Sequence, residues 1–312
     1  MPPHSFSSSQ SFSFNADSTL GALLVGVLLS YVLFGVTTTQ TYLYSGRFPN
    51  DSRAIKLMVA CVWLLELGHV ICIGHTLYVL AVSGFGHPER FATIPQSLGV
   101  STILNALVAM CVQGFLSFRI FRLWKRLYIP FLTWTLSFLF LGATGVVFVA
   151  GLQSMPFQLF EKQWGWLLDT LWAVAAANDL IIAATLVFWL ARKREDSELM
   201  TPVIDKVIAW TIETGLITSA AAILNLVCFV TMKNNFIWIA WYVVTARLYS
   251  NSFLASLNSR GTLRTMTTKI SISKPYPLLS SNISVNTEMP GRTPPWLSPP
   301  ASAVSRNSYM MG

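Results

Sequence analysis

Seven long apolar stretches, separated by short polar connections, constrain the fold of this chain more than any other feature. They lie at about 18–40, 57–82, 96–118, 128–152, 164–190, 207–232 and 235–257. Each is long enough to cross a hydrocarbon core of about 30 Å, which needs roughly 20 helical residues. Because lipid offers no hydrogen bonds to the backbone, each crossing segment should be an α-helix. The sequence therefore predicts an all-α, polytopic membrane protein, a seven-transmembrane-helix bundle.

The composition supports a membrane protein and argues against a soluble one. Of the 312 residues, 53% are hydrophobic and only 11% are charged, whereas about 25% are charged in an average soluble domain. The net charge of +8 raises the question of nucleic acid as a partner. The basic residues are gathered in the connections between apolar stretches, so we expect no nucleic acid to bind.

The basic residues also predict the orientation of the chain. If the N-terminus is outside, the cytoplasmic connections and tail hold Arg47, Arg53, Lys56, Arg119, Arg122, Lys125, Arg126, Arg192, Lys193, Arg194, Lys206, Arg260, Arg264, Lys269, Lys274, Arg292 and Arg306. The opposite face then holds only Arg90, Lys162 and Lys233. The positive-inside rule thus places the N-terminus outside and the C-terminus in the cytoplasm. Most of these basic residues are expected to contact anionic lipid headgroups, so membrane lipids are expected partners. We expect the plasma membrane rather than an internal membrane.

The segments outside the apolar region have a different composition. Residues 1–17 are rich in Ser and Phe and form a short, disordered extracellular N-terminus by this interpretation. The transmembrane domain is expected at 18–260. Residues 261–312 are rich in Ser, Thr and Pro, which predicts a disordered cytoplasmic tail. The tail and inner loops are the expected contact for a cytoplasmic signalling partner.

Ionisable side chains inside the apolar stretches are the candidate functional residues, because burying them in a membrane is costly. The candidate intramembrane polar site consists of Glu66, His69, Asp179, Glu213 and Arg247. Glu66 and His69 are three residues apart and share one helix face. Arg247 keeps its proton and needs an acceptor, and Glu66 at a matching depth is the predicted partner. A structural pair that fixes helix register and a ligand contact both stay open.

A basic and aromatic segment closes the third apolar stretch. Arg119, Arg122, Lys125 and Arg126 form a cytoplasmic basic patch around Trp124. Arg side chains that reach toward the headgroups and interfacial Trp residues both anchor a helix at the membrane surface. This patch is therefore expected at the inner interface.

Motifs for catalysis are missing from the sequence. It contains no G-x-S-x-G and no P-loop. The Glu66–His69 spacing supplies only half of a di-metal pattern that needs a second copy. His69 and His75 lie on different faces of one helix, and 235–257 has no Lys for a retinal Schiff base. We expect neither an enzyme nor a bound metal or cofactor.

Several segments resemble a family of seven-helix membrane proteins of basidiomycete fungi that is defined only as a domain of unknown function. They are Gly21–Tyr44, Phe48–His69, Arg119–Trp124, Ile204–Ser219 and Leu248–Arg260. The resemblance covers nearly all of 20–260. It implies a fungal multi-pass membrane protein and no particular activity.

Two function classes fit this sequence. The helix count, the orientation and the Ser/Thr-rich tail favour a receptor-like bundle that senses a small or lipidic ligand. The alternative is a small-solute or proton-coupled transporter that uses the charges near the membrane midplane. No internal repeat is evident, which argues against the transporter. The sequence also lacks an outer-loop cysteine pair and an Asn-Pro-x-x-Tyr segment, which argues against ordinary G-protein coupling.

Overall fold

Helices account for almost the whole of the described chain. The computed structural model describes residues 17–85, 95–152, 157–195, 201–232 and 236–273. The described residues up to Ser271 form one compact unit. In the described residues the α-helices are α1 (Ala22–Arg47), α2 (Arg53–Tyr78), α3 (Gln96–Trp124), α4 (Tyr128–Leu152), α5 (Phe157–Glu195), α6 (Thr201–Thr231) and α7 (Ile237–Ser273). Single π-helical turns, η1 (Asp17–Gly21) and η2 (Val79–Ser83), precede α1 and follow α2.

Among the described residues, six helical segments are long and apolar enough to cross a membrane. They are Thr19–Arg47, Arg53–Ser83, Gln96–Trp124, Tyr128–Leu152, Leu159–Glu195 and Thr201–Thr231. The prediction of an all-α, multi-pass membrane protein is therefore confirmed. The helix α7 does not reach the same apolarity, because Arg247, Ser250 and Asn251 interrupt its apolar stretch. Its crossing of the membrane stays a prediction, as does the orientation of the termini.

Several helices are longer than the apolar stretches that predicted them. The expected 164–190 helix runs over Phe157–Glu195, and the expected 235–257 helix runs over Ile237–Ser273. The length of an apolar stretch matches the thickness of the hydrocarbon core. A helix can continue beyond that stretch into the headgroup region, because its backbone hydrogen bonds are internal. The structured part of α7 thus extends beyond the expected boundary at 260. Residues 1–16 and 274–312, on which the disorder predictions mostly fall, lie outside the described residues.

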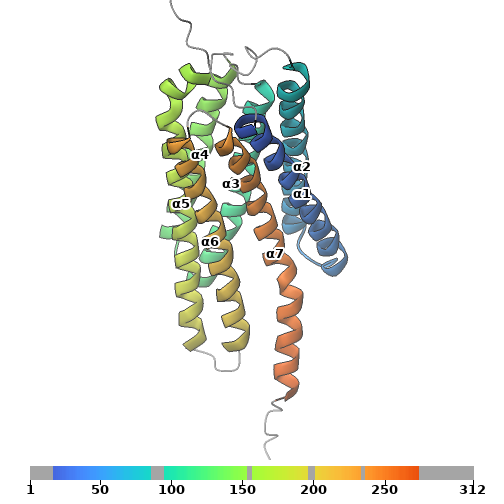
Figure 1. Cartoon of the computed structure of the whole chain (residues 1–312). Helices are drawn as coiled ribbons and strands as arrows, with labels where there is room; N and C mark the ends of the chain where they lie inside the picture. Colours follow the sequence, from blue (N-terminus) through green and yellow to red (C-terminus); the bar gives the residue numbers. More distant parts are fainter. Residues whose placement is uncertain (1–16, 86–94, 153–156, 196–200, 233–235, 274–312) are drawn as a thin grey trace, which may run out of the picture. The chain divides into compact units, whose positions relative to one another are not determined.

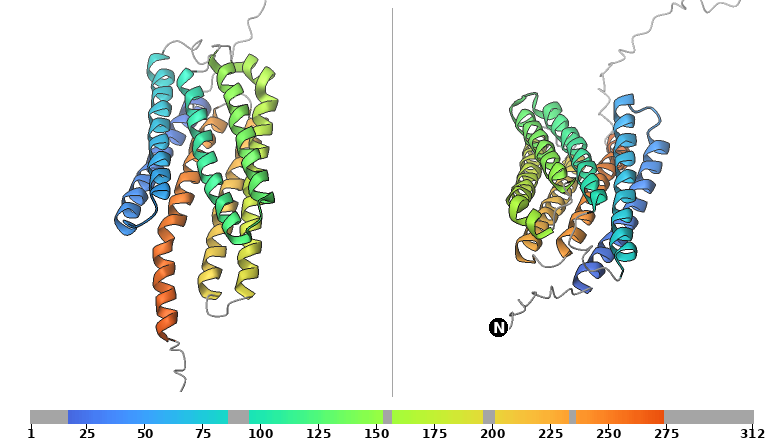
Figure 2. Two further views of the ribbon diagram at one scale, coloured as in Figure 1. Left: turned by 180° about the vertical axis from the view of Figure 1, so that it is seen from behind. Right: turned by 90° about the horizontal axis from the view of Figure 1, so that it is seen from above.

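Consecutive helices run in opposite directions (Figure 1). The turn between α1 and α2 and the turn between α3 and α4 lie toward the same end of the bundle, which we call the inner end (Figure 2). Side-chain contacts place α7 between the α1–α2 pair and α5, since Arg247 binds Ser30 while Tyr249 binds Asp179. The basic patch of Arg119, Arg122, Lys125 and Arg126 lies at this inner end.

The bundle exposes apolar side chains and buries polar ones. Val32, Leu64 and Phe188 are more than half exposed. In contrast, polar side chains as large as Arg247 and Gln113 are almost completely buried. This is the reverse of a soluble protein, in which buried charges are rare, and it is the arrangement that lipid around the helices requires.

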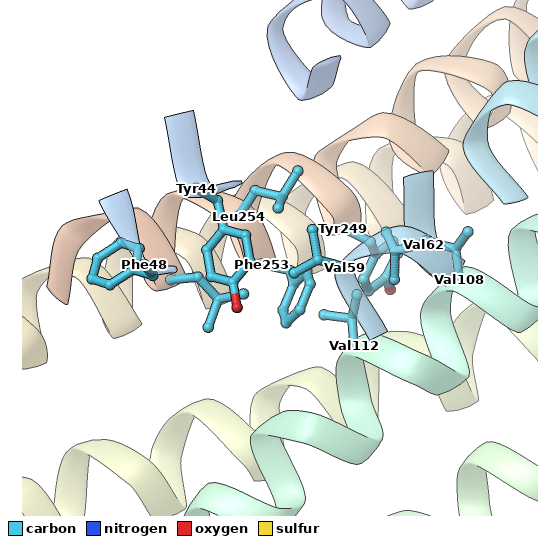
Figure 3. Packing of buried hydrophobic residues seen from close by; sticks show 10 residues of the cluster. Tyr44, Phe48, Val59, Val62, Val108, Val112, Tyr249, Phe253 and Leu254 are labelled. Carbon is cyan, nitrogen blue, oxygen red and sulfur yellow. The ribbon is translucent and has the colours of Figure 1, made fainter. Parts of the chain in front are cut away.

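Two apolar clusters hold α7 in the bundle. The inner cluster packs α7 against α1, α2 and α3 through Tyr44, Phe48, Val59, Val62, Val108, Val112, Tyr249, Phe253, Leu254 and Leu257 (Figure 3). In the outer half, Trp172, Phe229 and Trp238 pack as an aromatic group. The ring of Phe229 meets those of Trp172 and Trp238 edge to face, with centroids 5.0 and 5.1 Å apart. Such pairs add about 0.5–1.5 kcal/mol beyond area burial.

Candidate intramembrane polar site

Arg247 on α7 is fully buried and is held by side chains of α1 and α2. Its guanidinium forms an ion pair with the Glu66 carboxylate. Its Nε donates to Ser30 Oγ at 2.8 Å, and its Nη1 donates to the Glu66 carbonyl at 3.2 Å. Glu66, the partner expected from the sequence, is the one that the structure places there.

His69 completes this group and its protonation follows from its partner. Its Nδ1 lies 2.6 Å from Arg247 Nη2. A guanidinium only donates hydrogen bonds, so Nδ1 must accept and the ring proton belongs on Nε2. Among the described residues, Nε2 has no hydrogen-bond partner. We call Ser30, Glu66, His69 and Arg247 the arginine cluster.

Burial makes the arginine cluster sensitive to the loss of any one member. A charge pair removed from water loses several kcal/mol of hydration per ion, which mutual attraction and extra hydrogen bonds must offset. Ser30 and the Glu66 carbonyl supply such extra bonds. Together the contacts fix the depth of α7 relative to α1 and α2, so the structural interpretation of this pair is well supported by its geometry.

Asp179 lies in a separate network on the other side of α7. Its Oδ1 accepts from Gln113 Nε2 at 2.9 Å, and its Oδ2 accepts from the Tyr249 hydroxyl at 2.7 Å. These bonds join α3, α5 and α7 around one buried carboxylate. We call the group of Gln113, Asp179 and Tyr249 the aspartate network.

The aspartate network continues into α4 through neutral groups. Gln113 Oε1 accepts from Ser137 Oγ at 2.8 Å and from Asn178 Nδ2 at 3.0 Å. Ser117 and Thr133 share a further hydrogen bond of 2.7 Å one turn away. Four helices are therefore linked through consecutive polar contacts, each individually modest in a membrane at about 0.6 kcal/mol.

The arginine cluster and the aspartate network are connected through α7 itself. Arg247 and Tyr249 are two residues apart, which turns their side chains about 200° from each other on a helix. Arg247 therefore faces α1 and α2, whereas Tyr249 faces α3 and α5. Any rotation or shift of α7 changes both groups together.

A cavity of about 730 Å³ occupies the inner half of the bundle. Residues of α1, α3, α5, α6 and α7 line it, and it reaches Asp179, Gln113 and Tyr249 of the aspartate network. Toward the inner end it is lined by Arg47 and Arg260. Its volume lies within the range of about 300–1,000 Å³ that is usual for small-molecule sites.

A second cavity, in the outer half, is much smaller. It measures about 90 Å³ and is lined by Asn105, Tyr242 and mainly apolar side chains of α3, α4, α5 and α7. Since a water molecule takes about 30 Å³ of liquid volume, this space would hold a few waters. The inner cavity is therefore the better candidate for a ligand.

The remaining predicted residues are divided between the cavity and the surface. Glu213 also lines the inner cavity but is exposed, and it is not part of the arginine cluster. Arg119 is half-buried in the cavity wall, whereas Arg122, Lys125 and Arg126 are exposed. Lys125 also ends α3, in a left-handed conformation with φ of 58°. Glu66, His69 and Arg247 thus belong to the arginine cluster, whereas Asp179 and Glu213 line the inner cavity.

An ion pair at the inner end ties the α1–α2 turn to α7. Arg260 Nη2 donates to Asp51 Oδ2, which also accepts from the Tyr44 hydroxyl at 3.0 Å. The Arg260 guanidinium lies 4.6 Å from the centre of the Phe48 ring. Burial alone would raise the pKa of Asp51, but the bonds from Arg260 and Tyr44 and the charges of Arg260 and Arg264 bring it below its ordinary value.

Sequence reasoning missed the neutral members of both groups. Ser30 and Tyr249 carry no charge, and Ser and Tyr are common in membrane helices, so neither stood out. Gln113 and Asn178 are likewise uncharged. The one available signal is that Arg247 and Tyr249, two apart, place polar groups on both faces of one helix.

The buried polar side chains join helices to one another and border the inner cavity. Within the described ranges, no group of three or more His, Cys, Asp or Glu side chains could hold a metal ion. Asp179 and the arginine cluster are engaged with neighbouring helices, and the cavity adjoins the aspartate network. That the protein is not an enzyme stays a prediction.

These features define a multi-pass membrane protein built as a helical bundle with a polar interior. A domain described as a family of unknown function, DUF6534, is found at residues 175–262. The match includes Asp179 and both Arg247 and Tyr249, so it contains the α5 and α7 members of the two groups. No curated protein and no solved structure matches the chain. The fungal origin expected from the resemblance stays a prediction.

Proposed function

We propose that the chain is a seven-helix, receptor-like membrane protein that senses a small or lipidic ligand and passes the signal to a cytoplasmic partner. The observation that carries this proposal is the inner cavity, which adjoins the aspartate network. A ligand there would contact five helices and would bias the position of α7. Such coupling requires only that the ligand bind two arrangements of α7 with different affinity.

The packing of the outer half favours sensing over transport. Alternating access would need a second path from the aspartate network to the outer side. Above the network, Trp172, Phe229 and Trp238 pack together beside α7, and the second cavity that adjoins them measures only about 90 Å³. The inner cavity below the aspartate network and the packed aromatic group above it support a receptor-like role.

Proximity labelling from the cytoplasmic tail tests the signalling role. The full chain, fused to a labelling enzyme, is expressed in its native membrane with and without a non-hydrolysable GTP analogue. The proposal expects a labelled Gα subunit whose labelling depends on the nucleotide. The absence of any such partner, in cells where a known receptor labels Gα, would contradict it.

A proton-coupled transporter is the second candidate, because Asp179 places a titratable carboxylate beside the cavity. Proteoliposomes with an internal pH-sensitive dye distinguish the two functions. Transport predicts a proton flux that Asp179→Asn abolishes and that Glu213→Gln does not. The receptor-like function predicts no flux above that of protein-free liposomes.

A further inference from the structure

Two of the arginines that line the inner cavity have no ion-pair partner among the described residues. Arg119 is half-buried in the cavity wall, and its guanidinium forms no hydrogen bond or ion pair with any residue in the described ranges. Arg47 lines the cavity at the end of α1, is exposed, and likewise has no such partner within those ranges. Arg260 lines it as well but is bound to Asp51. A half-buried guanidinium that lacks an acceptor is costly and calls for an anion.

The acidic residues of the cavity do not meet this need. Asp179 already accepts hydrogen bonds from Gln113 and Tyr249. Arg119 follows Gln113 by six residues on α3, which places it about 9 Å farther toward the inner end. Glu213 is an exposed residue of α6 that forms no ion pair with a residue the structure describes. The two arginines therefore remain available to a ligand.

The walls of the cavity are largely apolar. Phe115 and Leu116 of α3, Ile182 and Leu186 of α5, and Phe253 and Leu257 of α7 line it. Contact with such walls favours an apolar group by about 25 cal/mol per Å² removed from water. A free phosphate ion would satisfy the arginines but leave these walls uncovered. Apolar walls next to cations describe a site for an amphiphile with an anionic headgroup.

We propose that the inner cavity binds an anionic phospholipid of the cytoplasmic leaflet, with its phosphate on Arg119 and Arg47 and its acyl chains along the apolar walls. Basic pockets between helices at the cytoplasmic side of a membrane suit such headgroups. Arg binds phosphate through two parallel hydrogen bonds, which gives geometric selectivity as well as attraction. This proposal rests on the proposed function, because it names the class of ligand that the inner cavity binds. It also requires that the inner end faces the cytoplasm, as the sequence predicts.

The chain supplies a matched pair of variants for the test. Arg119→Gln removes the charge from the cavity wall and keeps most of the side chain. Arg122→Gln removes the same charge three residues later, at an exposed position that does not line the cavity. General attraction of the basic inner end for anionic lipid, about 1 kcal/mol per residue, affects both variants equally. Only a bound headgroup distinguishes them.

Native mass spectrometry of the purified full chain in neutral detergent measures the binding. The protein is titrated with phosphatidylglycerol, with phosphatidylcholine and, in a separate arm, with inorganic phosphate. We expect preference for phosphatidylglycerol, and an affinity about tenfold weaker for Arg119→Gln, which corresponds to about 1.4 kcal/mol. Arg122→Gln should lose markedly less. Inorganic phosphate should not displace the lipid.

Three results would overturn the inference. They are equal losses for the two variants, equal binding of the two lipids, and displacement by inorganic phosphate alone, which would indicate a simple anion site. If Arg119→Gln does not fold, Ser256→Trp provides a second variant, since it narrows the cavity without changing its charge. It should likewise lose phosphatidylglycerol, and retained binding would contradict the site.

The two experiments, lipid binding and proximity labelling, can fail independently of each other. Lipid binding without a nucleotide-sensitive partner in proximity labelling would leave the lipid site intact and remove the receptor-like function. A nucleotide-sensitive partner without selective lipid binding would keep the function and remove the lipid as the ligand.

Discussion

At the scale of single residues, the interior of the bundle is organised by a guanidinium that keeps its proton at physiological pH. Arg247 forms its ion pair with Glu66 and shares hydrogen bonds with Ser30 and His69. The two partners on α2 are one turn apart, so α7 can dock at only one depth without leaving a buried charge unpaired. The arginine cluster thereby sets the register of α7.

Replacing one member of this pair should cost more than replacing both. Glu66→Gln leaves Arg247 buried without its counterion, and breaking such a pair typically costs about 3–5 kcal/mol. Adding Arg247→Met should restore part of the loss, with a coupling of at least about 1 kcal/mol. Reversible unfolding in mixed SDS micelles gives the free energies of the single and double variants. Losses that simply add would show that the two side chains do not interact.

Some contacts of these residues could be predicted from the sequence, and others could not. The pairing of Arg247 with Glu66 followed from matching depth and from the need for an acceptor. Glu213 was assigned to the same site because depth alone does not indicate which way a side chain faces around its helix. The roles of Ser30 and Tyr249 depend on which helices become neighbours, and no local pattern contains that information.

At the scale of helices, close approach depends on small residues. A Cβ added at Gly26 of α1 would lie 2.7 Å from the Ala240 backbone of α7, whereas one added at Gly35 would meet nothing within 4 Å. Without a hydrophobic driving force between helices in lipid, such contacts carry much of the association. Apolar length predicted the existence of these helices but neither their ends nor their contacts.

Gly26→Ala and Gly35→Ala form a matched pair on one helix. The first should destabilise the bundle by about 1–3 kcal/mol, since α7 must move to relieve the overlap. The second should be neutral or stabilising by up to about 1 kcal/mol, because Ala favours helix more than Gly does. Unfolding free energies in micelles measure both. Equal effects would show that the α1–α7 crossing is not tightly packed.

The inner ion pair gives the junction of α7 with the α1–α2 turn a defined pH dependence. Because the folded pKa of Asp51 lies below its ordinary value of 3.8, its contribution is fully present above that value. The contribution is lost as the pH falls through the lower folded pKa.

The difference in thermal midpoint between the wild type and Asp51→Asn isolates this contribution. The wild type should be the more stable protein from about pH 7 down to about pH 4, and the gap should close only below that range, where the Asp carboxyl takes up its proton. Asn50, the neighbouring turn residue, offers a control, since Asn50→Ala should leave the pH dependence unchanged. A gap that closes between about pH 5 and 6 would contradict a lowered pKa.

At the scale of the whole molecule, α7 links the arginine cluster to the aspartate network. Six segments qualify as membrane crossings by length and apolarity, and α7 does not, because it carries the polar side chains that join the two halves of the interior. The sequence predicted the class of fold and the basic inner end, since both follow from composition along the chain. It could not predict the inner cavity, which results from how five helices are arranged around one another.

The side of the membrane on which each terminus lies depends on whether α7 crosses the membrane. Small epitope tags are added to both ends of the full chain, and antibody access is compared in intact and permeabilised cells. Seven crossings predict that the N-terminal tag is accessible in intact cells and that the C-terminal tag is accessible only after permeabilisation. Access to both tags from the same side would mean an even number of crossings, and it would contradict an α7 that spans the membrane with Arg247 against Glu66.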